Sequence, residues 1–195
     1  LAIQTLVSRE IEPFQPAVVT VGSIHGGSKH NVIPDRVDLQ LTVRFFSDEI
    51  YDQIINGLKR ITRGVGLSAG LPEDRLPEVI PLEGVTPPVA NDPALVNKSI
   101  LSMEEMLGTG NIHKVNPSTV GEDFGMYGRT KENVPIALFW LGAVGKEKYD
   151  DHIKNGTPLP GLHNAAFHPD FYPTFRGGVA AMTKTMIDLF NGKLE

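Results

Sequence analysis

The chain contains no cysteine among its 195 residues, which excludes disulfide bonds and thiol catalysis. Its Lys and Arg residues form no run of five and the formal net charge is -5, so the basic surface typical of nucleic-acid binding is missing. The sequence also lacks an apolar stretch approaching about 18 residues, the length that a membrane-spanning helix needs. These absences indicate a soluble protein with a small or neutral partner.

Familiar hydrolase motifs are missing as well. The sequence has no Gly-x-Ser-x-Gly elbow, which disfavours a serine-type hydrolase, and no His-Glu-x-x-His pair. What remains is His163, in a Gly- and Pro-punctuated loop before the last helical segment. A hydrolytic zinc site needs at least three protein ligands and an open position for water, so the partners of His163 would have to lie elsewhere. From the residues alone, His163 is either a metal ligand or an exposed loop histidine bonded to backbone.

The first half of the chain has a clear order of elements. Residues 1–10 show helical apolar spacing but no capping residue before them, so we expect a helix cut in mid-course and a chain that is the C-terminal portion of a longer protein. Residues 17–24 are a β-branched run that predicts a strand. After a glycine-rich bend at 26–28, residues 37–45 alternate between apolar and polar side chains, as in a half-covered strand.

A helix and a short strand are expected to complete this domain. Ser47 is suited to cap a helix with apolar residues at three- and four-residue spacing, which frays near Gly64 and Gly66. Residues 78–80 lie between prolines and can only be an edge strand. With one strand added before the cut, the order becomes β-α-β-β-α-β. We therefore predict a ferredoxin-like α+β domain over residues 1–88 that lacks its first strand.

The second half, residues 89–195, predicts a different architecture. A helix is expected from Asn91 or Asp92, and another over residues 175–189. Residues 112–115 are a short strand candidate, and residues 136–142 are a continuous apolar run typical of a strand buried on both faces. The pattern indicates part of an α/β domain whose sheet is covered by helices.

Three motifs resemble those of a known family. They are Gly-Gly-Ser-Lys-His-Asn-Val-Ile-Pro-Asp at 26–35 with Thr-Val-Arg at 42–44, Gly-Glu-Asp-Phe at 121–124, and Leu-His-Asn at 162–164. Their order and spacing resemble the C-terminal half of the M20 metallopeptidases, in particular the aminoacylase-like branch of hippurate and auxin-conjugate hydrolases. The resemblance covers nearly the whole chain.

This resemblance implies that the two parts of the chain have different roles. Residues 1–88 would be a lid that also makes a homodimer, and residues 89–195 would be the C-terminal part of a catalytic α/β domain. The intact enzyme would hold two divalent metal ions, with zinc, manganese and cobalt all compatible with imidazole and carboxylate ligands. His163 would be the family's last metal ligand. The other ligands and the glutamate that acts as general base would lie outside this chain.

Three further residues are candidates for substrate binding. Asn31 follows the glycine bend, and its amide can both donate and accept, although it could instead hold a turn. Its resemblance to positions linked to substrate binding in the related carboxypeptidases favours the binding role. Arg44 has a planar fork that suits a carboxylate, or it makes a surface ion pair. Glu122 lies at a loop-to-helix junction, where the resemblance implies that it shapes the cleft. There the neighbouring Asp123 could be a plain helix cap.

We therefore expect part of a metal-dependent amidohydrolase that cleaves N-acyl amino acids or similar small amides. The alternative is a catalytically inert dimerisation or small-molecule binding module derived from the same family. Neither nucleic acid nor membrane is expected as a partner. The cytoplasm is the favoured compartment, and any N-terminal signal would lie outside the chain. The 195 residues alone are expected to be inactive.

Overall fold

The computed structural model describes residues 1–82 and 84–192, and the chain divides into two compact units. Unit 1 comprises residues 1–89 and 117–133, and unit 2 comprises residues 90–116 and those from 134 onward. The elements of unit 1 are η1 (Leu6–Glu10), β1 (Val18–Gly26), β2 (Val37–Arg44), α1 (Asp48–Ser68), η2 (Glu73–Arg75) and η4 (Asp123–Arg129). Those of unit 2 are α2 (Pro93–Leu107), η3 (Thr109–Asn111), α3 (Lys146–Asn155) and α4 (Phe171–Phe190).

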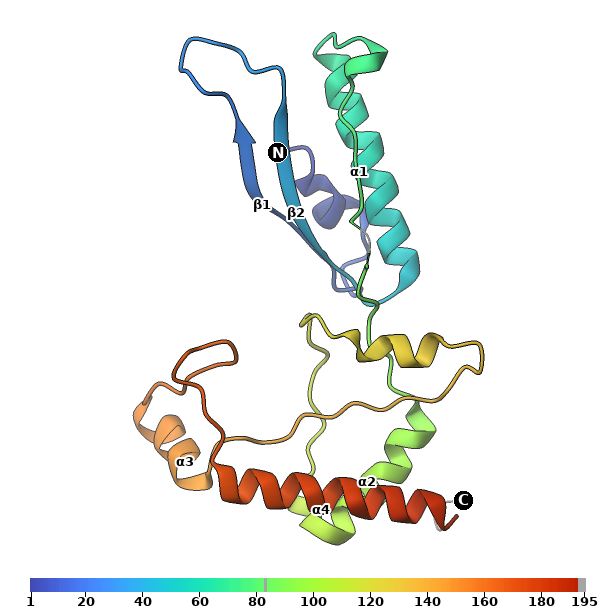
Figure 1. Ribbon diagram of the computed structural model, residues 1–195, viewed down its shortest axis with the longest axis vertical. Coiled ribbons are helices and arrows are strands. Elements are labelled where there is room, and N and C mark those ends of the chain that lie inside the picture. The colour runs from blue at the N-terminus through green and yellow to red at the C-terminus, as the bar shows by residue number, and fades with distance from the viewer. Residues whose placement is uncertain (83, 193–195) are drawn as a thin grey trace. The chain divides into compact units, whose positions relative to one another are not determined.

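Unit 1 is built on an antiparallel hairpin beside a long helix (Figure 1). In the register of β1 and β2, Val18 lies opposite Arg44 at one end and Gly26 lies opposite Val37 at the loop end, with an irregularity between Val21 and Ser23. The strands predicted at residues 17–24 and 37–45 and the α+β class are confirmed.

The core of unit 1 lies between the hairpin, α1 and the N-terminal turn. Ile50, Ile54 and Leu58 recur at four-residue spacing, so they share the face of α1 that is buried. Leu6 is fully buried against this face, next to Gly57, where an added Cβ would come within 2.2 Å of the Leu6 Cδ2 atom. Burial of such a leucine stabilises the fold by about 1.5–3 kcal/mol. A glycine at position 57 therefore makes room for the central side chain of this core.

The start of α1 follows its local signal, whereas its end does not. The Ser47 hydroxyl accepts a hydrogen bond from the Ile50 amide at 3.4 Å, which confirms the expected cap of α1. The expectation that α1 frays at Gly64 and Gly66 is wrong, because the helix continues to Ser68. Gly66 is buried where Leu76 and Pro77 pack against it, so the returning chain stabilises the last turn.

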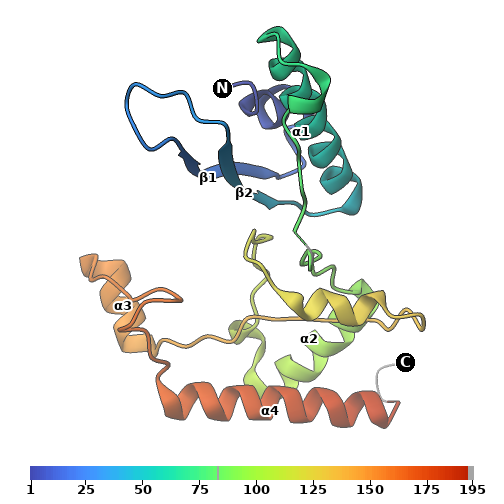
Figure 2. The same cartoon turned by 45° about the horizontal axis from the view of Figure 1, so that its top comes forward.

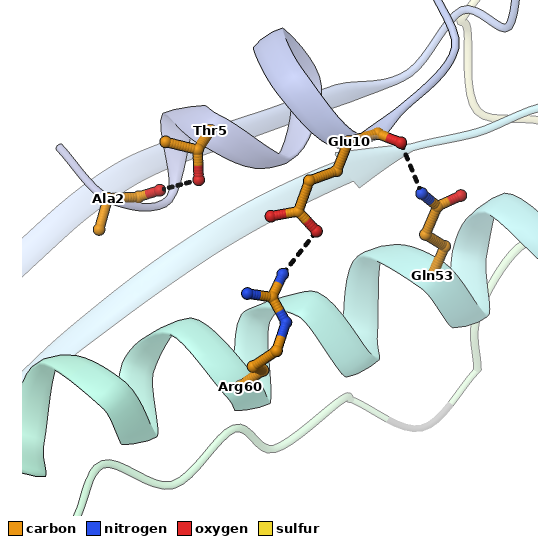
Figure 3. Close-up of polar contacts among 5 residues, drawn as sticks. All are labelled: Ala2, Thr5, Glu10, Gln53 and Arg60. Atoms are coloured by element: carbon orange, nitrogen blue, oxygen red, sulfur yellow. Dashed lines mark hydrogen bonds and ion pairs between the residues drawn. The ribbon is translucent and has the colours of Figure 1, made fainter.

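The N-terminal segment is helical, as its spacing predicts, and ends in the π-helix η1. Figure 3 shows how its end is tied to α1: the Gln53 side chain donates a hydrogen bond of 2.8 Å to the backbone oxygen of Glu10, and Arg60 pairs with the Glu10 carboxylate. The same figure shows Thr5 donating to the Ala2 oxygen at 2.7 Å. The two contacts of Glu10 hold η1 against α1, where the Leu6 side chain of η1 is buried in the core.

The strand expected at residues 78–80 is wrong. This segment is extended but pairs with no strand among the residues that the structure describes, whose sheet has the two strands β1 and β2. Pro77 and Pro81 flank it and have no N–H to donate, and Val79 instead packs its side chain against the core of unit 1.

In unit 2, α2 and α4 pack together (Figure 2). Asp92 accepts a hydrogen bond of 2.7 Å from the Leu95 amide, so the predicted start of α2 is confirmed. Met103 and Ala181 are buried in this unit, and Lys184 of α4 pairs with both Glu105 and Asp188. Helix α3 was not expected from the sequence.

The two strands expected in unit 2 do not form in the described part of the chain. Residues 112–115 and 136–142 are extended without a strand partner. The Asn91 side chain donates to the Leu138 oxygen at 2.7 Å and accepts from the Leu138 amide at 2.8 Å, in place of a neighbouring strand. Trp140 is 58% exposed, because a strand that is buried on both faces needs neighbours that the described residues do not supply.

Candidate functional site

His163 lies in unit 2 on the loop between α3 and α4. The Asn164 amide donates to the Gly161 oxygen at 3.2 Å, which closes a turn with His163 at its third position and a φ of 64°. Histidine adopts this left-handed conformation at a cost of about 1–3 kcal/mol. The next turn is closed when the Asn164 side chain accepts from the Ala166 amide at 2.8 Å. Two hydrogen-bonded turns therefore fix the backbone conformation around His163.

The imidazole of His163 is available to a ligand. Its side chain is exposed, and no hydrogen bond in the described part of the chain involves its ring. No group of three His, Cys, Asp or Glu residues that could hold a metal ion occurs among residues 1–82 and 84–192. His163 can thus offer a metal ion one imidazole ligand, and the remaining ligands of a hydrolytic site would have to come from elsewhere.

Asn31 lies in unit 1, in the loop that joins β1 to β2. Gly27 turns the chain with a φ of 80°, and the Val32 amide donates to the Lys29 oxygen at 3.3 Å across a second turn. The Asn31 side chain is exposed and makes no hydrogen bond with the residues described here. Its amide is free to bind a ligand rather than committed to holding the turn.

Arg44 is the last residue of β2, at the end of the hairpin away from this loop. A strand rises about 3.3 Å per residue, so the length of β2 places Arg44 about 20 Å or more from Asn31. The structure therefore does not bring these two residues together within unit 1. No ion pair of Arg44 occurs within the described ranges, so its guanidinium can bind a carboxylate.

The Gly-Glu-Asp-Phe motif lies against Arg44. A Cβ added at Gly121 would come within 2.6 Å of the Arg44 Nη1 atom, so this glycine lets the backbone approach the guanidinium closely. Glu122 follows directly and accepts a hydrogen bond from the Phe124 amide at 3.1 Å, which caps η4. One carboxylate oxygen of Glu122 is thereby engaged, one residue after the glycine that lies against Arg44.

Contacts that the sequence did not predict hold this motif in unit 1. Arg129 pairs with Asp48 at the start of α1, at 2.8 Å, and lowers the pKa of the Asp48 carboxyl. A Cβ at Gly125 would be 2.8 Å from the backbone oxygen of Pro88, so η4 sits directly on that backbone. Residues so far apart in sequence carry no local signal of such contacts.

Comparisons with known proteins show which proteins this chain resembles. A family model described as the peptidase dimerisation domain matches residues 2–67, which include the hairpin and nearly all of α1. The chain is 36% identical over 140 residues to the N-acetyldiaminopimelate deacetylase of Streptococcus thermophilus, covering 72% of this chain and 35% of the relative. It is 32% identical over 147 residues to the N-acetyl-L-cysteine deacetylase of Bacillus subtilis, covering 74% of this chain and 32% of the relative.

A solved structure is also similar. A protein of methicillin-resistant Staphylococcus aureus, provisionally named an aminohydrolase, superimposes with a TM-score of 0.72 at 26% identity, covering 95% of this chain and 43% of that protein. The chain thus spans about a third of the length of the curated relatives it matches. Of the helices described, none is long and apolar enough to cross a membrane.

Proposed function

The chain belongs to the M20 family of peptidases and amidohydrolases, and from this premise we propose that it is part of a metal-dependent enzyme that hydrolyses the amide bond of N-acyl amino acids. The observation that supports this most is the exposed imidazole of His163, presented on a loop of defined turns with its ring unbonded to the described residues. In this proposal residues 1–88 are the lid and residues 89–195 the C-terminal part of the catalytic domain.

His163 would be one ligand of a centre that holds two divalent ions, zinc, manganese or cobalt. Such a centre supplies a polarised carbonyl and an activated water when it is loaded. The task of His163 is to hold its imidazole, in the neutral form, where an ion binds. We place the general base outside this chain, because none of the residues discussed here occupies a position that its motif marks for that role.

Arg44 and Glu122 would contribute to substrate binding. The guanidinium of Arg44 offers two parallel N–H donors, the geometry that a substrate carboxylate accepts. Gly121 lies against this guanidinium, and the next residue, Glu122, keeps one carboxylate oxygen free of the capping bond. Asn31 would bind at a separate place, because a small amide is too short to reach from Arg44 to Asn31 of the same copy.

The substrate class follows from this chemistry and from the relatives. Two of them are named for deacetylation of N-acetyldiaminopimelate and N-acetyl-L-cysteine, which are both N-acyl amino acids. A free α-carboxylate is common to that class, and Arg44 is suited to bind it. The alternative is an inert dimerisation or binding module, which is favoured only if the intact protein binds no metal.

The test is replacement of His163 by Ala in the intact protein. We expect the variant to lose one of two bound ions and most of its amidase activity, while its thermal unfolding temperature stays within a few degrees of the original because the side chain is exposed. Elemental analysis measures the number of bound ions, and hydrolysis of N-acetyl amino acids measures the activity. Replacement of His168, the other histidine of the loop, is the matched control. Full metal content and normal turnover in H163A would refute the assignment.

A further inference from the structure

Asp170 closes the C-terminal end of the loop that carries His163. It stands directly before α4, where an Asp normally caps its own helix, yet its side chain makes no such bond. Its carboxylate is turned instead to the start of α3, where one oxygen accepts a hydrogen bond of 2.6 Å from the Gly145 amide and the other pairs with Lys148. The backbone amide of Asp170 also donates to the Ala143 oxygen at 2.8 Å. The residue thus joins the loop to α3 through side chain and backbone together.

The fit around this carboxylate is close. A Cβ added at Gly145 would come within 2.8 Å of the Asp170 Oδ2 atom, and the Asp170 side chain is only 23% exposed. The Lys148 ammonium, the Gly145 amide and, more weakly, His168 lower the pKa of Asp170. The carboxylate is therefore ionised at neutral pH and accepts hydrogen bonds with its full charge.

The other end of the loop is held by the same helix. The His152 Nδ1 atom lies 2.7 Å from the Thr157 oxygen, and the Gly156 amide donates to the His152 oxygen at 2.9 Å. Between the two anchored ends, the Phe167 amide donates to the Asn164 oxygen at 2.9 Å, next to the turn that contains His163. Both ends of the loop therefore depend on α3, and the segment between them is a chain of turns.

We propose that Asp170 is a positioning residue for His163: it fixes the loop to α3, so that the imidazole is presented in one orientation to the metal. The inference rests on the proposed function of His163 as a ligand. Its physical basis is that a loop ligand binds tightly only when the surrounding contacts have already ordered it. In this proposal Asp170 is not itself a metal ligand and acts through the loop backbone.

The test compares three variants of the intact protein, loaded with zinc or cobalt. Asp170→Ala removes both side-chain contacts, whereas Asp170→Asn retains an oxygen that can accept from Gly145. Asp150→Asn is the matched control, because Asp150 also pairs with a lysine of α3, at 2.6 Å from Lys146, and no hydrogen bond or ion pair joins it to the loop among the residues described. Metal affinity is measured by competition with a chelator, and the ligand geometry by the visible absorption of the cobalt form.

We expect Asp170→Ala to weaken binding of one ion by about tenfold or more and to shift the cobalt spectrum, with a smaller effect in Asp170→Asn and none in Asp150→Asn. Amide hydrogen exchange at residues 164–167 of the metal-free protein should be faster in Asp170→Ala. A merely structural role would lower the unfolding temperature of the metal-free protein and leave affinity and spectrum unchanged, and that result would overturn the proposal.

His163→Ala separates this proposal from the one on which it rests. If His163→Ala loses an ion while Asp170→Ala binds metal normally, only the role of Asp170 is overturned. If His163→Ala keeps both ions, the ligand assignment itself fails and the role of Asp170 fails with it. If Asp170→Ala does not fold, the comparison of Asp170→Asn with Asp150→Asn decides, and equal metal affinity in those two overturns the proposal.

Discussion

At the level of single residues, Gly121 determines how closely the backbone approaches Arg44. Gly121→Ala would place a Cβ within 2.6 Å of the Arg44 Nη1 atom, so the guanidinium must shift away from the position in which we propose that it binds substrate. We expect KM for N-acetyl amino acids to rise about tenfold, which is about 1.4 kcal/mol of binding free energy. The unfolding temperature should hardly change, because the atom that moves is the end of a flexible side chain.

Gly110→Ala is the matched control for this substitution. A Cβ at position 110 meets no atom within 4 Å, so its kinetics should match those of the original protein. Arg44→Ala should raise KM at least as much as Gly121→Ala. A normal KM in Gly121→Ala beside a raised KM in Arg44→Ala would show that the close approach is unimportant, although Arg44 binds substrate.

The ion pair between Asp48 and Arg129 makes the free energy of unfolding depend on pH in a defined direction. The hydrogen bond from Arg129 is the main cause that lowers its pKa in the folded protein. The pair therefore contributes to stability at pH above the ordinary value of about 4 for aspartate, and this contribution is lost as pH falls through the lower, folded pKa. We expect the free energy of unfolding to fall more steeply below pH 4 in the original protein than in Asp48→Asn. Urea unfolding at several pH values measures this, and parallel curves would contradict it.

The site residues could be predicted from the sequence only in part. His163, Arg44 and Glu122 come from short motifs, and the structure leaves the His163 ring and the Arg44 guanidinium unbonded within the described residues. The approach of Gly121 to Arg44 could not be predicted, because it joins residues far apart in the chain. The separation of Asn31 from Arg44 depends on the hairpin register, which the spacing of the motifs does not state.

At the level of elements, the glycines of α1 differ in what surrounds them. Gly64 has no atom within 4 Å of an added Cβ, so Gly64→Ala should stabilise the protein by about 0.5–1 kcal/mol through helix propensity. Gly57→Ala gains the same propensity but would meet Leu6 at 2.2 Å. Displacing a core leucine costs about 1–3 kcal/mol, so we expect net destabilisation there. Denaturant unfolding should show opposite signs, and stabilisation by Gly57→Ala would mean that Leu6 repacks freely.

The elements that were predicted correctly are those with local signals. Ser47 and Asp92 cap α1 and α2 as expected, because a cap and its first turn are neighbours in sequence. Helix α3 was missed, because its sequence is mostly charged and Gly145 precedes it without a side-chain cap. The strands expected at 78–80, 112–115 and 136–142 are wrong. Their apolar content can be seen in the local sequence, but whether a strand finds a partner depends on residues far away in the chain.

At the level of the whole molecule, the hairpin leads us to predict a homodimer through unit 1. A sheet of two strands leaves an unpaired edge on each of them. Ile24 and Leu39 lie opposite each other in the hairpin and are 65% and 45% exposed, so this part of the hairpin presents apolar side chains to solvent. Sedimentation of the intact protein should give twice the monomer mass at micromolar concentration.

Two substitutions locate the surface that associates. Ile24→Lys should shift the equilibrium toward monomer, because it places a charge on the exposed apolar part of the hairpin. Thr42→Lys adds the same charge at an exposed polar position and serves as the control. A monomeric original protein, or equal dissociation in the two variants, would count against a dimer made by this surface.

The last prediction concerns the 195 residues on their own. They should show no amidase activity at any concentration of zinc or manganese, because one imidazole does not hold an ion in a hydrolytic geometry and no general base is placed by its motif. Phe171, Phe175 and Val179 of α4 are 70%, 58% and 50% exposed and lie close to Leu141, which is 44% exposed, so the isolated chain should bind a hydrophobic dye such as ANS strongly. Metal-stimulated hydrolysis of an N-acetyl amino acid by the purified chain would show that catalysis does not depend on residues outside it. Glu122 and Asp123 would then be the first carboxylates to test as general base.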